Sequence, residues 1–148
     1  MATAPTSTTA AEIERECTRL VLLFTEFVDS GRYERLRELF APDGLFYRPG
    51  EPDRAMRVDE VIDSYRMRLG TNASMHLVTN ILITPESDTT ASGSVRILFY
   101  AAPTDTPSES GKGRKATMQF VGRFDDRFVR TAQGWRFAER RGEILFNV

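Results

Sequence analysis

The sequence has little of the side chains that build covalent cross-links and metal centres. Its 148 residues include one cysteine, Cys17, and one histidine, His76. An internal disulfide is therefore impossible, which fits a reducing compartment, and a site built from several histidines or cysteines cannot form. No acidic cluster has the spacing of a carboxylate-only metal site either. We accordingly expect a cytoplasmic protein that works without a cofactor.

Charge of one sign and long apolar runs are also missing. Twenty basic residues oppose 21 acidic ones, for a formal net charge of −1. Nucleic-acid binders usually carry a basic excess, so we expect no nucleic acid and no anionic membrane as a partner. The longest apolar run, residues 20–24, is too short to span a bilayer. Residues 1–10 lack the features of a secretion signal and are expected to form a disordered tail before a single domain over 11–148.

The first half of the chain has a helical pattern. Apolar residues recur at three- and four-residue steps over 11–30, which predicts an amphipathic helix that stops at Gly31. A short helix over 33–40 and a third helix over 59–69 are also expected. Between them, residues 41–44 read as a turn and 45–47 as a short strand.

The second half predicts long strands, at about 75–83, 91–101, 115–130 and 135–148. Residues 132–134 predict a tight hairpin, and the Pro/Ser/Gly-rich segment 103–112 is either a mobile hairpin tip or a lid. Helices followed by strands indicate an α+β fold. A long sheet that bends over helices leaves a concavity, where small-molecule sites tend to form.

Alternation along 75–83 gives the only histidine a face. His76, Val78, Asn80 and Leu82 share one side, and the other side is apolar apart from a threonine. The apolar side should meet the helices, which leaves His76 and Asn80 lining the cavity. An imidazole takes and gives protons near neutral pH, so His76 is a candidate acid–base group. A lone histidine is otherwise more often a structural one.

Asp29 is a candidate partner for that histidine. It lies at the end of the first predicted helix, where the helix dipole disfavours a carboxylate, so a compensating contact is expected. A pocket-facing imidazole would supply it, and the carboxylate would fix the tautomer of the ring and stabilise its cation. The alternative is that Asp29 caps the turn beside Ser30 and Gly31.

Two further side chains are candidates for substrate binding. Phe46 and Tyr47 point to opposite faces, so one should enter the core and Tyr47 the cavity, where its hydroxyl could polarise a carbonyl group. Arg140 on the last strand could reach the cavity and bind an anion. The alternatives are an amphipathic core tyrosine and a solvated arginine on an exposed face.

The chain resembles the nuclear-transport-factor-2-like superfamily and, within it, the SnoaL-like group, over residues 13–146. The segments that carry the resemblance are 27–29, 32–36, 39–44, 76–80 and 134–137. The resemblance implies a cone-like α+β barrel, in which three N-terminal helices pack on a strongly curved, mixed but mostly antiparallel sheet around a pocket. It also implies a homodimer or homotrimer.

Two enzyme types of this superfamily, scytalone dehydratase and hexachlorocyclohexane dehydrochlorinase, resemble the chain at their functional positions. Asp29 and His76 match both types, Tyr47 matches the first and Arg140 the second. The chain departs from them as well. Val28 stands where the dehydratase has another functional tyrosine, its second active-site histidine is missing, and Phe24 replaces the lysine of the dehydrochlorinase.

The expected function is that of a cofactor-independent lyase or isomerase acting on a small, largely apolar organic molecule. Dehydration, elimination of HX and cyclisation are the candidate reactions, with His76 abstracting a proton and Asp29 orienting it. Tyr47, Asn80 or Arg140 would stabilise developing charge. The alternatives are a non-catalytic small subunit of an aromatic-ring-hydroxylating dioxygenase and a ligand-binding protein of the same fold, because one fold hosts many functions.

Overall fold

The computed structural model describes residues 8–69 and 71–147, so residues 1–7 of the predicted tail lie outside the described residues. The elements are α1 (Ala10–Asp29), the 3₁₀-helix η1 (Tyr33–Glu38), β1 (Phe40–Tyr47), β2 (Ala55–Met56), α2 (Val58–Leu69), β3 (Asn72–Pro85), β4 (Thr90–Pro103), β5 (Ser108–Glu109), β6 (Gly113–Arg114), β7 (Met118–Thr131) and β8 (Gly134–Asn147). Three helices precede the long strands, which confirms the α+β prediction. Within the described ranges, neither α-helix is long and apolar enough to cross a bilayer.

Helix α1 begins with a capping box. The Thr9 hydroxyl accepts from the backbone N–H of Glu12 at 3.2 Å, and the Glu12 carboxylate accepts from the backbone N–H of Thr9 at 2.8 Å. Ala10 is therefore already helical, inside the predicted tail. The helix ends at Asp29, and Gly31 follows with φ of 73°, a conformation that glycine adopts without steric cost. The predicted helix is confirmed to within one residue at each end.

The segment after α1 differs from its prediction. The second helix is a 3₁₀-helix that stops at Glu38, and residues 41–44 lie inside β1 instead of forming a separate turn. The Leu39 carbonyl accepts from the backbone N–H of Phe137 at 2.7 Å, which draws the chain onto β8 directly after η1. A register shift between Phe40 and Leu45 then absorbs the intervening residues.

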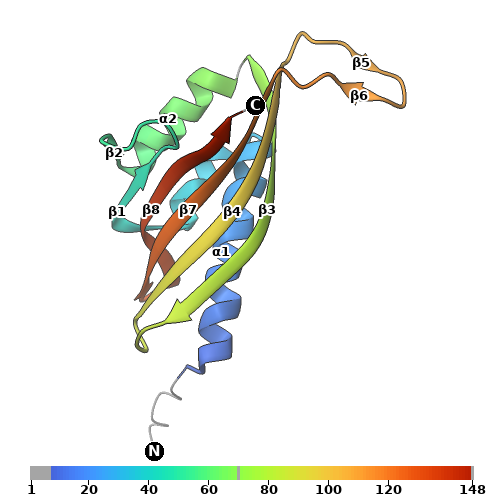
Figure 1. Ribbon diagram of the computed structural model, residues 1–148. Helices are drawn as coiled ribbons and strands as arrows, with labels where there is room; N and C mark the ends of the chain where they lie inside the picture. Colours follow the sequence, from blue (N-terminus) through green and yellow to red (C-terminus); the bar gives the residue numbers. More distant parts are fainter. Residues whose placement is uncertain (1–7, 70, 148) are drawn as a thin grey trace, which may run out of the picture.

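The large sheet has the strand order β2-β1-β8-β7-β4-β3. Strands β1 and β8 are parallel and the other neighbours are antiparallel, so the sheet is mixed and mostly antiparallel, as expected. The hairpin between β7 and β8 is confirmed, with residues 132 and 133 as its loop. The segment 103–112 contains β5 and the turn of the small β5–β6 hairpin, which projects away from one end of the sheet (Figure 1).

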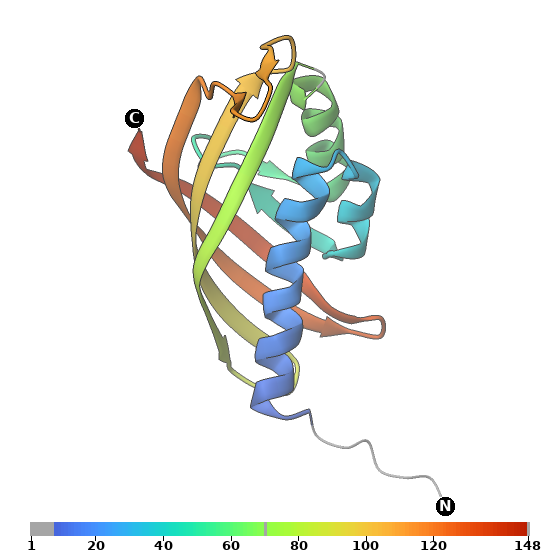
Figure 2. The same cartoon turned by 90° about the vertical axis from the view of Figure 1, so that its right-hand side faces the viewer.

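Helix α1 crosses the concave side of the curved sheet, and η1 and α2 lie beside its C-terminal end (Figure 2). The sheet curls strongly, but its edge strands β2 and β3 do not pair in the part of the chain that is described, so the barrel stays open. Phe24 is 1% exposed and lies at the centre of the core. Its ring centroid is within 6.5 Å of the rings of Phe40, Phe46, Tyr65, Phe124 and Phe137.

Candidate active site

A cavity of about 350 Å³ lies between the helices and the concave face of the sheet. Its volume is in the range of small-molecule sites. Most of its wall is aromatic or aliphatic, and the rings of Phe99 and Phe120 stack in it with centroids 4.7 Å apart. The polar side chains of the wall are Arg48, Tyr65, Arg68, Thr71, Asn72, Ser74 and His76. The cavity therefore suits an apolar ligand that carries a few polar groups.

His76, on the wall of this cavity, is in direct contact with Asp29. One carboxylate oxygen, Oδ1, lies 2.7 Å from the ring Nδ1 of His76, and the other accepts from the backbone N–H of His76 at 2.7 Å. The Ser74 hydroxyl donates to Oδ1 at 2.9 Å. These donors provide the compensation that a carboxylate at the C-terminal end of α1 needs. The capping of a turn by Asp29, the alternative from the sequence, has no described hydrogen bond.

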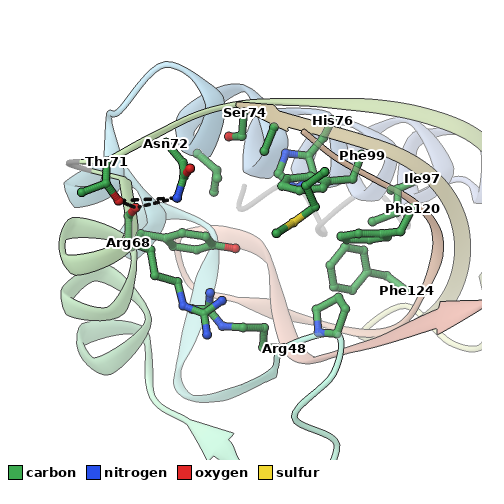
Figure 3. Close-up of a pocket in the computed structure, with 15 residues that line it drawn as sticks. Arg48, Arg68, Thr71, Asn72, Ser74, His76, Ile97, Phe99, Phe120 and Phe124 are labelled. Atoms are coloured by element: carbon green, nitrogen blue, oxygen red, sulfur yellow. Dashed lines mark hydrogen bonds between the residues drawn. The ribbon is translucent and has the colours of Figure 1, made fainter. Parts of the chain in front are cut away.

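The contact determines which ring nitrogen faces the ligand. With its proton on Nδ1, His76 donates to the carboxylate, and Nε2 keeps a free lone pair. Nε2 has no protein partner among the described residues. The ring packs at 4.7 Å from the ring of Phe99 and its side chain is 12% exposed, so it is held on the cavity wall (Figure 3). The arrangement is that of an oriented base with access to a ligand.

His76 also borders a second, more open groove on the outside, between α1 and β3. That groove adds Leu22, Met75 and Leu77 but neither of the pocket arginines. We assign the first cavity as the candidate active site, because it is the less open of the two and its wall carries two arginines together with His76. Asp29 lines the groove.

Arg48 and Tyr65 supply the polar groups on the other side of the cavity. Arg48 follows the last residue of β1 and its residue exposure is 7%. Its guanidinium lies 4.8 Å from the Tyr65 ring centroid and donates to the Ser64 hydroxyl. Burial lowers the pKa of Arg48, and burial raises the pKa of the Tyr65 phenol, which therefore keeps its proton at neutral pH.

Tyr47 does not line the cavity, contrary to the prediction. Phe46 is fully buried in the core, so Tyr47 points to the opposite, outer face of the sheet. There it lies 3.6 Å beneath the guanidinium of Arg141. The next residue, Arg48, returns to the inner face. Alternation from Phe46 would have pointed to Arg48 in place of Tyr47.

Asn80 is also outside the cavity. Asn80 and Ile81 together oppose one residue of β4, which makes a bulge, and Asn80 adopts a left-handed φ of 49°. Before the bulge, Met75 and Leu77 are about half exposed and His76 faces inward. After it, Ile81 packs against the core. The predicted apolar face is thus split, and Asn80 is an exposed bulge residue.

Arg140 is buried in the core and does not line the cavity. Ala138 is an extra residue opposite β7, so Arg140 falls on the inner face with Phe137 instead of opposite to it. Its side chain is 0% exposed and its Nη1 donates to Asp126 at 3.1 Å. Its guanidinium lies 4.0 Å from the ring centroid of Phe124, which lines the cavity.

The sequence reasoning missed Ser74, Arg48, Tyr65 and Arg68. Ser74 lies two residues before His76, so strand alternation alone would have placed it on the same face. Tyr65 and Arg68 are three residues apart on α2 and share a helix face. Across residues 8–69 and 71–147, no three His, Cys, Asp or Glu side chains gather in a group that could hold a metal ion.

The model of the SnoaL-like domain family matches residues 9–141. Among solved structures, the chain is similar to the Kfla4162 protein from Kribbella flavida, with 21% sequence identity, a TM-score of 0.77 and coverage of 93% of this chain and 95% of that one. It is similar to a protein from Novosphingobium aromaticivorans DSM 12444 that is provisionally named a scytalone dehydratase, with 20% identity, a TM-score of 0.74 and coverage of 90% and 85%.

The chain is also similar to the type 2 hexachlorocyclohexane dehydrochlorinase LinA, with 14% identity, a TM-score of 0.73 and coverage of 93% and 91%. At these identities the likeness concerns the fold. No curated protein sequence gives a significant match. Because the family match extends over α1, the cavity and most of β8, the chain belongs to the SnoaL-like domain family.

Proposed function

We propose that the protein is a cofactor-independent lyase or isomerase, in which His76 removes a proton from carbon in a small, largely apolar organic substrate. One observation carries the proposal: the Nδ1 of His76 lies 2.7 Å from the carboxylate of Asp29, beside an aromatic cavity. An imidazole oriented by a carboxylate is the arrangement that general-base chemistry requires.

The reaction begins with substrate packed against the aromatic wall. The lone pair of Nε2 takes the proton, and the electrons of the broken C–H bond form a double bond or an enolate. In an elimination, the leaving group departs with the electron pair of its bond. The imidazolium protonates a departing hydroxide to water, whereas a halide leaves as the anion and the imidazolium releases its proton to solvent. In an isomerisation, the imidazolium returns the proton to another carbon of the enolate as the double bond shifts. In a cyclisation, the enolate carbon attacks a carbonyl carbon of the same molecule, the C=O π electrons move to its oxygen, and the imidazolium protonates the resulting alkoxide.

Asp29 acts on this reaction as a positioning residue. It accepts the Nδ1–H bond before the transfer and stabilises the imidazolium after it. Its second oxygen is bound to the backbone N–H of His76, which holds ring and backbone in one relative orientation.

Stabilisation of the developing oxyanion falls to residues other than those the sequence singled out. Tyr47, Asn80 and Arg140 do not line the cavity. Tyr65 does, and its hydroxyl keeps a proton that it can donate. We assign Tyr65 the role of hydrogen-bond donor to the substrate oxygen.

Two solved structures with this fold have names that state elimination chemistry, dehydration in one and dehydrochlorination in the other. They support a lyase as a candidate for this chain, whereas the assignment of residues rests on the site geometry.

A homodimer or homotrimer and a cytoplasmic location stay predictions. Light scattering of the purified protein would measure the first.

The experiment is a substrate panel of β-hydroxy and β-halogenated ketones, with formation of the conjugated product followed by absorbance. His76→Ala should lower turnover about 10²- to 10⁴-fold, the range for a positioned acid–base group, with an unchanged circular dichroism spectrum. Met67→Ala, at a position that is 83% exposed and outside the cavity, serves as control and should keep full turnover.

Full turnover in His76→Ala would refute the mechanism. Binding of panel compounds without turnover in the wild type would favour the ligand-binding alternative, and co-purification with a large iron–sulfur subunit the dioxygenase one.

A further inference from the structure

Arg48 is held rigidly at the cavity wall. Phe46 is buried in the core, and alternation brings Arg48 back to the same side at the end of β1. The Tyr65 ring and the Ser64 hydroxyl of α2 hold its guanidinium from the helix side. A guanidinium fixed in this way is a preorganised group for a ligand.

Arg48 forms no ion pair within the described part of the chain. Among the described residues, no carboxylate lies within ion-pairing distance of it, and the one acceptor of its guanidinium is the neutral Ser64 hydroxyl. Arg140, another buried arginine, is paired with Asp126. The two arginines thus differ: Arg140 has a carboxyl group within hydrogen-bonding distance, and Arg48 has none among the described residues.

The neighbourhood of Arg48 is positive. Arg68, also on the cavity wall, and Arg54 share the single carboxylate of Glu51, at 2.9 Å and 3.2 Å. Three guanidinium groups therefore face one carboxylate at this end of the cavity. Their repulsion adds to burial in lowering the pKa of Arg48, but an arginine remains charged at neutral pH.

Burying a charge without a counterion is unfavourable. A bound anion would neutralise the positive charge of Arg48. The planar guanidinium has five N–H donors in a fixed fork that matches a carboxylate. Ser64 takes one of them, through Nη2, and Nε and Nη1 have no acceptor in the described part of the chain. The remaining donors suit two carboxylate oxygens.

We propose that Arg48 is the binding site for the carboxylate of an acidic substrate, so that the substrate is an aromatic or other ring-bearing carboxylic acid. The inference rests on the proposed function and deepens it by naming the substrate class. His76 and Arg48 lie on different sides of the cavity, with Phe99, Phe120 and Phe124 along the wall between them (Figure 3). The ring of the acid packs on these phenylalanines, the carboxylate meets Arg48, and a C–H bond at the other end meets His76.

The test compares two probes of the same shape, 2-naphthoate and 2-naphthamide, by isothermal titration calorimetry on the full chain. The wild type should bind the acid about 10- to 100-fold more tightly than the amide, the range for a charge-assisted hydrogen-bonded pair. Arg48→Met should abolish this preference and leave amide affinity within a few-fold of its wild-type value.

Arg54→Met is the matched control. It removes the same charge from a side chain that is 60% exposed and does not line the cavity, and it should keep the preference. Arg48→Lys keeps the charge but not the fork, and should retain part of the preference. The wild-type comparison needs no variant, so a missing preference overturns the proposal even if Arg48→Met does not fold. In that case Arg48→Lys ties an observed preference to Arg48.

Equal affinity of the wild type for acid and amide would overturn the proposal, and so would absence of acid binding at millimolar concentration. A parallel loss of both affinities in Arg48→Met would do the same, since Arg48 would then only shape the pocket. His76→Ala should keep the acid preference. Acid preference without turnover of any acid or ketone would support Arg48 as an anion site and contradict the proposed function. Turnover of the neutral ketones without acid preference would support the proposed function and overturn the assignment of Arg48.

Discussion

The carboxylate of Asp29 makes two hydrogen bonds to His76. One oxygen lies 2.7 Å from the ring Nδ1 and the other 2.7 Å from the backbone nitrogen of the same residue. The two contacts link the end of α1 to the start of β3 and leave the far ring nitrogen as the free one. The Ser74 hydroxyl adds a third hydrogen bond to the carboxylate. A helix end that would otherwise disfavour a negative charge thus becomes the support of the base.

The tautomer of His76 is the first prediction. Nitrogen NMR should show the neutral ring protonated on Nδ1, because Nδ1–H is the donor to Asp29. The only histidine of the chain gives this spectrum without ambiguity. In Asp29→Asn the preference for Nδ1–H should weaken, because a neutral amide replaces the carboxylate. Asp88→Asn, in an exposed turn, is the matched control and should leave the ring unchanged. A ring protonated on Nε2 in the wild type would contradict the assigned base.

The backbone of Asn80 leads to a second prediction. Its φ of 49° is in the left-handed region, which costs most L-residues about 1–2 kcal/mol and glycine little. Asn80→Gly should therefore keep the thermal stability and the turnover of the wild type, and Asn80→Val should lower the stability by about 1–2 kcal/mol. Thermal unfolding measures both. Loss of turnover in a stable Asn80→Gly variant would show that the side chain does act on the substrate.

The third prediction concerns pH and the buried pair of Asp126 and Arg140. Burial raises the pKa of Asp126 from 3.8 to about 7, and this effect outweighs the opposing influence of the Arg140 charge. As pH rises above the unfolded value, the unfolded carboxyl releases its proton and the folded one keeps it. The stability contributed by this group is therefore complete below about pH 4 and is lost as pH rises to about 7, by on the order of a few kcal/mol.

The comparison of wild type with Asp126→Asn isolates that contribution. The free energy of unfolding of both proteins would be measured by denaturant titration between about pH 4 and pH 8. The wild type should lose stability relative to the variant across the lower part of this interval and show no further relative change above pH 7. Parallel curves across the whole interval would show that Asp126 titrates normally.

The helices and the contact between Asp29 and His76 could be predicted from the sequence. The three- and four-residue spacing of buried side chains such as Cys17, Phe24 and Val28 reports the face of α1 directly, because one period holds throughout a helix. The predicted stop at Gly31 leaves Asp29 in the last turn of the helix. The strand that opens at Asn72 puts His76 on its inner side four residues later, before any irregularity intervenes.

The rest of the candidate site was decided by tertiary structure. One extra residue in a strand reverses the face of every side chain that follows, and the bulges at Asn80 and Ala138 do this in β3 and β8. Asn80 thereby turns to solvent and Arg140 into the core. No local pattern marks these bulges, because they arise from the fit of each strand to its curved neighbours. Arg48 reaches the cavity for a related reason: only the packing of Phe46 in the core decides which face of β1 is the inner one. The sequence by itself thus determined the α-helices, the long strands and one pair of polar residues, and the curvature of the sheet decided which other polar groups join them.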